Sequence, residues 1–289
     1  MILIVDSGST KADWRLLAAD GSHQTFHTRG FNPFLHSSTL IETSLRELLL
    51  PQLPLQEIKK IFYYGAGCSD AYRCSIVEEA LQRLFPDIQV HVDHDLLAAA
   101  RALCGHEPGI ACILGTGSNS CQYDGKVLTD HITNLGHILG DEGSGYHLGK
   151  LLIRSYFYRE MPTDIREAFE VFYPHGERAI LNQIYGNDKA NVFLSSFAKF
   201  IAAHKKNDYI KMLAAQAFTE FLDRHVCKYE KHTEWPICFI GSIAFHFQDI
   251  LKVVLEMKGM KLGNIIQKPI EKLTAFHFEK EAKAVGEQS

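Results

Sequence analysis

The 289-residue sequence lacks several features that would place it in other broad classes of protein. It has no Cys-x-x-Cys pair, no lysine- or arginine-rich block, no internal repeat and no low-complexity linker. The missing basic block and the formal net charge of −4 argue against nucleic acid or an anionic membrane as the main partner. No apolar run is long enough to span a membrane. The expected partner is therefore a small molecule.

The cysteines and the first apolar run indicate the compartment. Seven cysteines are scattered along the chain, several of them inside apolar runs, which is typical of reduced, buried thiols. The run Met1–Val5 is too short for the core of a secretory signal and lacks a basic start. These observations predict a cytoplasmic protein. The chain is long enough to form two modest hydrophobic cores.

The richest stretch begins with a turn of glycines and hydroxyl residues after a buried strand. The apolar run 109–114 leads directly into Gly115-Thr116-Gly117-Ser118. Glycines permit a sharp turn there, and such a turn exposes backbone N–H groups. Together with the hydroxyls of Thr116 and Ser118, these donors could bind a phosphate. An ordinary hairpin turn explains the same residues, so this motif alone leaves both interpretations open.

An acidic pair follows in the same stretch, inside the glycine-rich segment 140–145. Asp141 and Glu142 stand just before a helical pattern that begins near Tyr146. Asp141 could simply cap this helix. However, the glycines around the two acids exceed what a cap requires. The arrangement also suits hydrogen bonds to sugar hydroxyls or to a magnesium-bound water.

Two further glycine turns follow apolar strands. The segment Asp6–Lys11 separates the first strand from a second strand at 12–17, and it is either a phosphate cradle or a polar hairpin turn. Gly241 and Ser242 follow the apolar run 237–240 and lead into a helix extending to about Leu255. Close approach of a ligand and close helix packing explain this last turn equally well.

Asp95 lies between a predicted strand at 88–92 and a predicted helix at 96–103. The carboxyl ends of strands are where α/β sheets bind their ligands, so a carboxylate there is a candidate catalytic group. A helix N-cap is the alternative, and Asp93 competes for any catalytic role. From Tyr146 to Glu230 the pattern is almost wholly helical, with aromatic residues that we expect in the core.

In their order, these motifs resemble the sugar kinase, heat-shock protein 70 and actin superfold. The resemblance is closest to the N-acetylglucosamine kinase family, within the BadF/BadG/BcrA/BcrD-type ATPase group, and it covers nearly the whole chain. It depends most on the pairing of Gly115–Asn119 with Gly136–Ser144. It implies an α/β protein with two ribonuclease-H-like (actin-like ATPase) domains and an interdomain cleft. The domains would be 1–105 and a larger 106–273 with a helical insertion, and 274–289 would pack back on the first domain.

The resemblance also implies a function. It predicts an ATP-dependent sugar kinase that phosphorylates an amino sugar, most simply N-acetylglucosamine at its 6-hydroxyl, with ATP and Mg²⁺ as cofactors. Glucosamine or a muramic-type sugar stays open as the acceptor, and a homodimer is compatible with the resemblance. Asp95 would be the general base, and Asp6 would help to position Mg²⁺ through water. The implied hexose contacts are Asn32, Asn119 and Asp141, and the implied ATP and phosphate contacts are Asp6, Gly8, Ser9, Thr10, Lys11, Gly115, Thr116, Gly117, Ser118, Gly241 and Ser242.

Two other functions were weighed against this prediction. Relatives in the same group are ATPase activators of iron–sulfur dehydratases or reductases, but Cys68, Cys104 and Cys121 show no cluster-binding pattern. Repressors built on kinase folds usually add a helix-turn-helix in front, whereas this sequence begins at its first strand. A non-catalytic, sugar-responsive regulator is therefore the less favoured alternative.

Overall fold

The computed structural model describes residues 1–8 and 11–286, and the chain divides into two compact units. Unit 1 contains Met1–Gly105 and the segment from Pro269 onward, and unit 2 contains His106–Lys268. The segment that returns to unit 1 thus begins earlier than the Thr274 boundary expected from the resemblance. None of the described helices is long and apolar enough to cross a membrane.

Unit 1 is built on a five-stranded sheet with the strand order β3-β2-β1-β4-β5. The antiparallel hairpin β1–β2–β3 supplies one half, and β4 and β5 join β1 in parallel. The strands are β1 (Ile2–Ser7), β2 (Lys11–Leu17), β3 (His23–Arg29), β4 (Lys60–Gly65) and β5 (Gln89–His94). The helices are α1 (Ser38–Leu48), α2 (Ala71–Leu84), α3 (Asp95–Cys104) and α13 (Ile270–Gly286), with short 3₁₀ turns at Leu50–Gln52 and Leu55–Glu57.

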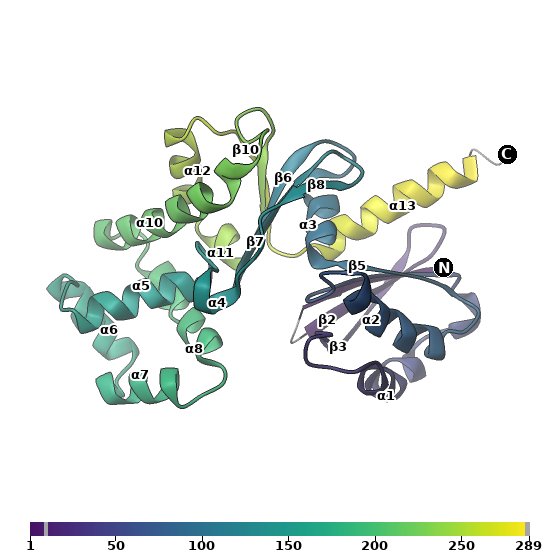
Figure 1. Cartoon of the computed structure of the whole chain (residues 1–289), viewed down its shortest axis with the longest axis horizontal. Coiled ribbons are helices and arrows are strands. Elements are labelled where there is room, and N and C mark those ends of the chain that lie inside the picture. Colours follow the sequence, from purple (N-terminus) through teal and green to yellow (C-terminus); the bar gives the residue numbers. More distant parts are fainter. Residues whose placement is uncertain (9–10, 287–289) are drawn as a thin grey trace. The chain divides into compact units, whose positions relative to one another are not determined.

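Helices cover both faces of the unit 1 sheet. The helices α1 and α2 pack together, as do α3 and α13 (Figure 1). On β4, Ile61 and Tyr63 belong to the core shared with α1 and α2, whereas Phe62 and Tyr64 face His277 of α13. Successive side chains of a strand point to opposite faces, so this alternation separates the two helical layers. A strand buried on both faces explains the uninterrupted apolar run of β1.

Unit 2 repeats the same topology with different connections. Its sheet has the order β10-β9-β6-β7-β8. When β6 is counted as the first strand and the order is read from β8 to β10, it is the same as in unit 1. The strands are β6 (Gly109–Leu114), β7 (Ser118–Tyr123), β8 (Leu128–His131), β9 (Ile237–Ile240) and β10 (Leu262–Ile266). The helices are α4 (Gly136–Leu139), α5 (Gly145–Phe157), α6 (Thr163–Phe172), α7 (Gly176–Tyr185), α8 (Ala190–Ser196), α9 (Ala198–Ala203), α10 (Asp208–Arg224), α11 (Ser242–His246) and α12 (Gln248–Met257), with a 3₁₀ turn at Val226–Lys228.

The helical segment between β8 and β9 forms most of the core of unit 2. Phe169, Phe197 and Phe200 are buried, as the helical spacing predicted, and the ring of Phe169 packs against both of the others. The prediction of a single helix after Gly241 was wrong, because the chain breaks at Phe247 between α11 and α12. The buried ring of Phe247 packs against Phe218 of α10.

Candidate active site

In unit 1, two carboxylates lie at the carboxyl ends of parallel strands of the same sheet. In the sheet register, Ser7 of β1 lies beside Gly65 of β4, which in turn lies beside His94 of β5. Asp6 therefore lies at the end of β1, and Asp95 is the first residue of α3 immediately after β5. Both residues are half-buried, and the charge of Asp95 acts on Asp6. The predicted base and the predicted metal-positioning residue thus lie at the same edge of the sheet, separated by β4.

The pKa values of both carboxyls are raised. Burial raises the pKa of Asp95 to about 6, although backbone N–H groups at the start of α3 oppose the shift. Burial, and then the negative charges of Asp95 and Asp13, raise the pKa of Asp6 to about 7, while Lys11 opposes this shift. The negative charge of Asp95 favours the protonated form of Asp6, because like charges repel. A carboxyl with a pKa near neutrality can take a proton from a hydroxyl and later release it.

The helix-cap interpretation of Asp95 is wrong. The N-cap of α3 is His94, whose Nδ1 accepts a hydrogen bond from the N–H of Leu97 at 3.1 Å. Asp93, the competing candidate, instead lines a cavity of about 280 Å³ with Tyr64 and Arg101 on the sheet face covered by α3 and α13. His94 is therefore the N-cap of α3, and the carboxylate of Asp95 interacts with the backbone N–H groups of Asp95 and Leu96.

Asn32 lies against the loop that follows β4. A Cβ placed on Gly67, which has a φ of +82°, would come within 2.3 Å of the side-chain oxygen of Asn32. That oxygen accepts a hydrogen bond from the N–H of Phe34 at 2.9 Å, and the backbone N–H of Asn32 donates to Nδ1 of His36 at 3.0 Å. The loop 30–36 and the loop after β4 are therefore held together beside the end of β4.

The first glycine turn is described only in part. Ser9 and Thr10 lie outside the described residues. Gly8 is exposed, and its N–H donates to the carbonyl of Lys11 at 3.0 Å. The ammonium of Lys11 forms an ion pair with Asp13 at 2.7 Å. The turn connects a hairpin, since β1 and β2 pair antiparallel on either side of it, and its role as a phosphate cradle stays a prediction.

In unit 2, the turn between β6 and β7 presents two backbone donors. The pairing of β6 with β7 shows that it is a hairpin turn, closed by a hydrogen bond from Gly115 N–H to the carbonyl of Gly117 at 3.0 Å. Within the described part of the chain, the N–H groups of Thr116 and Gly117 make no hydrogen bond. The Ser118 N–H donates to Asp141, and the Ser118 hydroxyl is buried. The donors left for an anion are therefore those of Thr116 and Gly117.

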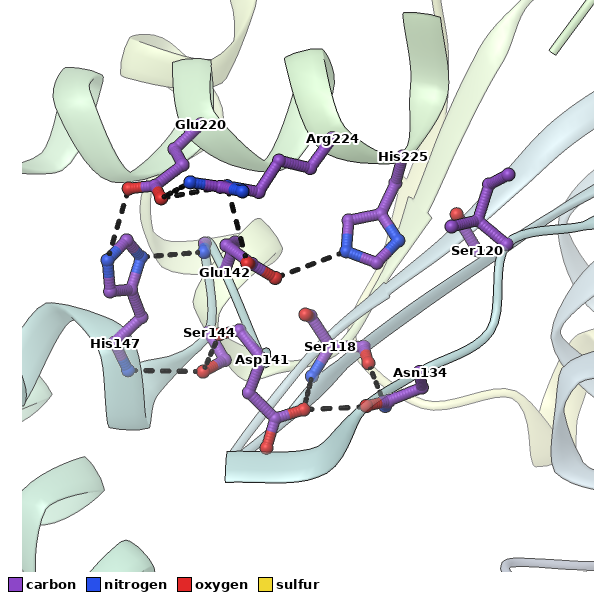
Figure 2. A network of polar contacts seen from close by, with 12 residues as sticks. Ser118, Ser120, Asn134, Asp141, Glu142, Ser144, His147, Glu220, Arg224 and His225 are labelled. Atoms are coloured by element: carbon purple, nitrogen blue, oxygen red, sulfur yellow. Dashed lines mark hydrogen bonds and ion pairs between the residues drawn. The ribbon is translucent and has the colours of Figure 1, made fainter. Parts of the chain in front are cut away.

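Asp141 is an anchor of this turn and not a helix cap. The cap of α5 is Ser144, whose hydroxyl accepts a hydrogen bond from His147 N–H at 3.2 Å. Oδ1 of Asp141 accepts from Ser118 N–H at 3.0 Å and from the side-chain amide of Asn134 at 3.4 Å (Figure 2). The backbone of Asp141 has a φ of +60°, which is uncommon for a residue with a side chain. Such a conformation persists only where its surroundings enforce it.

Sequence reasoning missed Asn134. Its amide contacts both Ser118 and Asp141, and its oxygen accepts from Gly136 N–H at 2.6 Å. An asparagine two residues before a glycine is a known signal for such a local turn, but that signal does not reveal a contact with Asp141. Asn119, a predicted hexose contact, lies in β7, and its side-chain oxygen accepts from Ser120 N–H at 2.9 Å.

Glu142 belongs to a charged network with α10 (Figure 2). Its carboxylate pairs with Arg224 at 3.4 Å and with His225 at 3.2 Å. Nearby, His147 accepts a hydrogen bond from Gly143 N–H at Nδ1, so its proton resides on Nε2, which faces Glu220 at 3.5 Å. Burial lowers the pKa of His147. This network fixes the backbone around Asp141.

The third glycine turn is explained by packing. Gly241 has a φ of +120°, and a Cβ there would come within 2.3 Å of the carbonyl oxygen of Leu114, at the end of β6. Only glycine tolerates this approach. Ser242 is exposed at the start of α11. The turn therefore lies directly beside the β6–β7 turn.

All seven cysteines are free thiols, and four of them, Cys68, Cys112, Cys121 and Cys238, are buried. No group of three or more histidine, cysteine or acidic side chains among the described residues is arranged to hold a metal by itself.

Comparison with known proteins gives one strong likeness and several weaker ones. No protein-family model matches the chain. The chain is 41% identical to a candidate N-acetylglucosamine kinase from Porphyromonas gingivalis, and its fold matches that crystal structure with a TM-score of 0.91 over 97% of this chain and 100% of the other. It is 24% identical over 222 residues, 72% of each chain, to the N-acetylmuramic acid/N-acetylglucosamine kinase of Clostridium acetobutylicum.

A more distant structure shares the fold. A ROK family glucokinase from Streptomyces griseus, solved in complex with glucose and AMPPNP, matches with a TM-score of 0.53 at 13% identity, over 95% of this chain and 97% of the other. At this identity the likeness concerns the fold alone.

Proposed function

Because the chain belongs to the N-acetylglucosamine kinase family, we propose that it transfers the γ-phosphoryl group of ATP to the 6-hydroxyl of N-acetylglucosamine. Family membership makes the protein a phosphotransferase that acts on an alcohol group, and its two units have the actin-like ATPase fold. The observation that carries the proposal is Asp95, a half-buried carboxylate at the end of a parallel strand with no capping role and a raised pKa.

Asp95 is the proposed general base. With a pKa of about 6, it is mostly ionised at neutral pH and remains basic enough to accept the proton of the attacking hydroxyl. Phosphoryl transfer requires little covalent chemistry from the protein, so orienting the hydroxyl is as important as removing its proton. A carboxylate hydrogen-bonded to the hydroxyl does both.

The proposed phosphate contacts are the free N–H groups of Thr116 and Gly117 and the first glycine turn with Gly8 and Lys11. Asp6 is the proposed magnesium-positioning residue. Its carboxylate oxygens are hard ligands of the kind that Mg²⁺ prefers, and its raised pKa reports a negative charge that lacks full compensation. When bound, Mg²⁺ would neutralise charge on the phosphates. Gly241 and Ser242, in the turn beside the β6–β7 turn, would contact the nucleotide.

The proposed acceptor contacts are Asn32 in unit 1 and Asn119 and Asp141 in unit 2. Oδ2 of Asp141 has no hydrogen-bond partner among the described residues and is not enclosed, so it can accept from a sugar hydroxyl. The relatives from Porphyromonas gingivalis and Clostridium acetobutylicum are both named for N-acetylglucosamine, and the second is also named for N-acetylmuramic acid. These names favour an amino sugar with an acetylated nitrogen.

The test is a sugar panel assayed with ATP and Mg²⁺, comprising N-acetylglucosamine, glucosamine, N-acetylmuramic acid and glucose. We expect the highest kcat/KM with N-acetylglucosamine, and phosphorus–proton NMR coupling to the C6 protons of the product. The matched control is 6-deoxy-N-acetylglucosamine, which should bind and give no product. A higher kcat/KM with another sugar would move the acceptor assignment. ATP hydrolysis without transfer to any sugar, in a brown iron-containing preparation, would instead indicate an ATPase activator.

A further inference from the structure

We propose that Asn134 is a positioning residue that holds Asp141 ready for the acceptor sugar. The inference rests on the proposed function, because it assumes that Asp141 contacts the acceptor. Asn134 lies in the segment between β8 and α4, and its side chain bridges three separate backbone or side-chain groups. Figure 2 shows it facing both Ser118 and Asp141.

The hydrogen-bonding capacity of this amide is matched to its surroundings. Its oxygen accepts from Gly136 N–H at 2.6 Å, and its nitrogen donates to the carbonyl of Ser118 and to Oδ1 of Asp141. An asparagine amide has two N–H donors, and both face an acceptor here. No other uncharged side chain of this size supplies one acceptor and two donors in the same plane.

The consequence for Asp141 is that its two oxygens are differentiated. Oδ1 receives two donors, from Ser118 N–H and from Asn134, whereas Oδ2 has no partner among the described residues. Asp141 is 8% exposed, and its unpaired oxygen Oδ2 is not fully buried. Oδ2 therefore retains contact with solvent. Asn134 therefore presents one carboxylate oxygen outward in a fixed direction.

Asn134 also connects Asp141 to an exposed apolar segment. The hydrogen bond to Gly136 fixes the start of α4, where Leu135, Ile138 and Leu139 are 59%, 76% and 72% exposed. The nucleotide donors of Thr116 and Gly117 are not among the contacts of Asn134, so a change at Asn134 should act mainly on the sugar.

The experiment compares Asn134→Ala and Asn134→Asp with the control Asn187→Asp. Asn187 forms the same kind of local turn, since its oxygen accepts from Lys189 N–H at 2.9 Å, but it lies exposed between α7 and α8. We expect Asn134→Ala to lower kcat/KM for the sugar by about 10- to 100-fold, the usual effect of losing a hydrogen bond to a charged group. Nucleotide affinity, measured by direct binding, should change less than about twofold.

Asn134→Asp should make the loss of kcat/KM depend on pH, which a mere loss of side-chain packing at this position would not do. It keeps the acceptor for Gly136 N–H but places a second carboxylate against Asp141, and such a pair takes up one proton. The other titratable groups close by are Glu142, which is paired with Arg224 and His225, and Tyr146. The ratio of variant to wild-type kcat/KM should rise as the pH falls from 9 to 6, because the shared proton restores one donor. For Asn187→Asp this ratio should stay flat.

The outcomes separate the two proposals. Wild-type protein that phosphorylates no sugar overturns the proposed function. A wild-type kinase whose Asn134 variants match the control, show a pH-independent ratio, or lose nucleotide and sugar affinity equally overturns the role of Asn134. Should Asn134→Ala fail to fold, Asn134→Asp, which keeps the turn, still decides the question.

Discussion

The two units share one strand order but treat their acidic residues in opposite ways. In unit 1, Asp6 and Asp95 lie at the same edge of the sheet, and burial raises the pKa of both. In unit 2, Asp141 receives two hydrogen bonds, and Glu142 is paired with two side chains of the α10 region. The two sheets share a strand order, but they differ in their carboxylates. The negative charges of Asp6 and Asp95 lack full compensation, whereas those of Asp141 and Glu142 are compensated by hydrogen bonds or ion pairs.

This difference suggests a division of labour. A carboxylate that lacks full compensation gains from a proton, a cation or a hydroxyl donor, so it suits the chemical step. A carboxylate that is already hydrogen-bonded has a fixed orientation, so it suits positioning. The comparison predicts that substitutions in unit 1 act on turnover, while those in unit 2 act on binding.

The largest effect is expected for Asp95→Asn. Asparagine keeps the size of aspartate but cannot accept the hydroxyl proton at its amide, so kcat should fall by about 10²- to 10⁴-fold with little change in ATP binding. Steady-state kinetics and direct nucleotide binding measure the two quantities. Wild-type kcat/KM should also fall as the pH drops below about 6, the pKa of Asp95.

Asp93→Asn is the control for that variant. Asp93 lines the cavity beside Arg101 and should keep near-normal turnover. The comparison fails if the Asp93 variant loses turnover while the Asp95 variant keeps it, because the base would then be the other carboxylate.

A smaller, binding-type effect is expected for Gly115→Ala. A Cβ on Gly115 would project into open space in front of the turn, so the fold should tolerate it. If phosphate approaches this turn closely, the methyl group should raise the KM for ATP by roughly 10-fold, as overpacking of about 1–3 kcal/mol implies. Unchanged ATP kinetics in the folded variant would contradict the phosphate assignment.

Gly117→Val tests the link between the turn and Asp141. The sequence predicts loss of nucleotide turnover with an intact fold, because valine would obstruct the phosphate. The structure adds that a Cβ here would come within 2.7 Å of Oδ1 of Asp141. We therefore expect Gly117→Val to impair sugar binding as well, whereas Gly115→Ala should spare it. Equal effects of the two variants on sugar KM would argue against this link.

Much of the fold could be predicted because local patterns coincide with tertiary structure. The apolar run of β1, the turn after β6 and the strand β9 are all local signals, and they are found where expected. The break at Phe247 was not predictable, because it depends on a ring that packs against Phe218 of another helix. The boundaries of elements follow tertiary contacts more than propensity.

The candidate site was predictable only as a set of residue types. The sequence offered Asp95 and Asp141 either as caps or as functional groups, and local pattern could not separate these roles. The structure separates them because His94 and Ser144 supply the caps. Asn134 was missed because its partners Ser118 and Asp141 are distant in sequence or lie across a turn.

The smallest effect is expected in stability, from Asp6→Asn. Burial raises the pKa of Asp6 to about 7 in the folded protein, well above the ordinary value of an aspartate, so the folded state holds a proton that the unfolded state releases. This bound proton increases the free energy of unfolding. Its contribution is complete below pH 4 and is lost as the pH rises through 7. The ligand-free protein should therefore lose stability between pH 5 and pH 8, by on the order of 1–3 kcal/mol from this group.

Asn cannot titrate and carries no charge against Asp95, so Asp6→Asn should flatten the pH dependence and raise Tm at pH 8 by a few degrees while lowering turnover. Thermal melts at pH 5 and pH 8 measure this, with Asp20→Asn as the control, since Asp20 is an exposed turn residue bonded to Ser22. Adding Mg²⁺ and a non-hydrolysable ATP analogue should stabilise wild type more than the variant, because the cation relieves the repulsion that Asn has already removed. Equal stabilisation of both would mean that Asp6 does not help to position the metal, and that the two units do not differ in the role of their carboxylates.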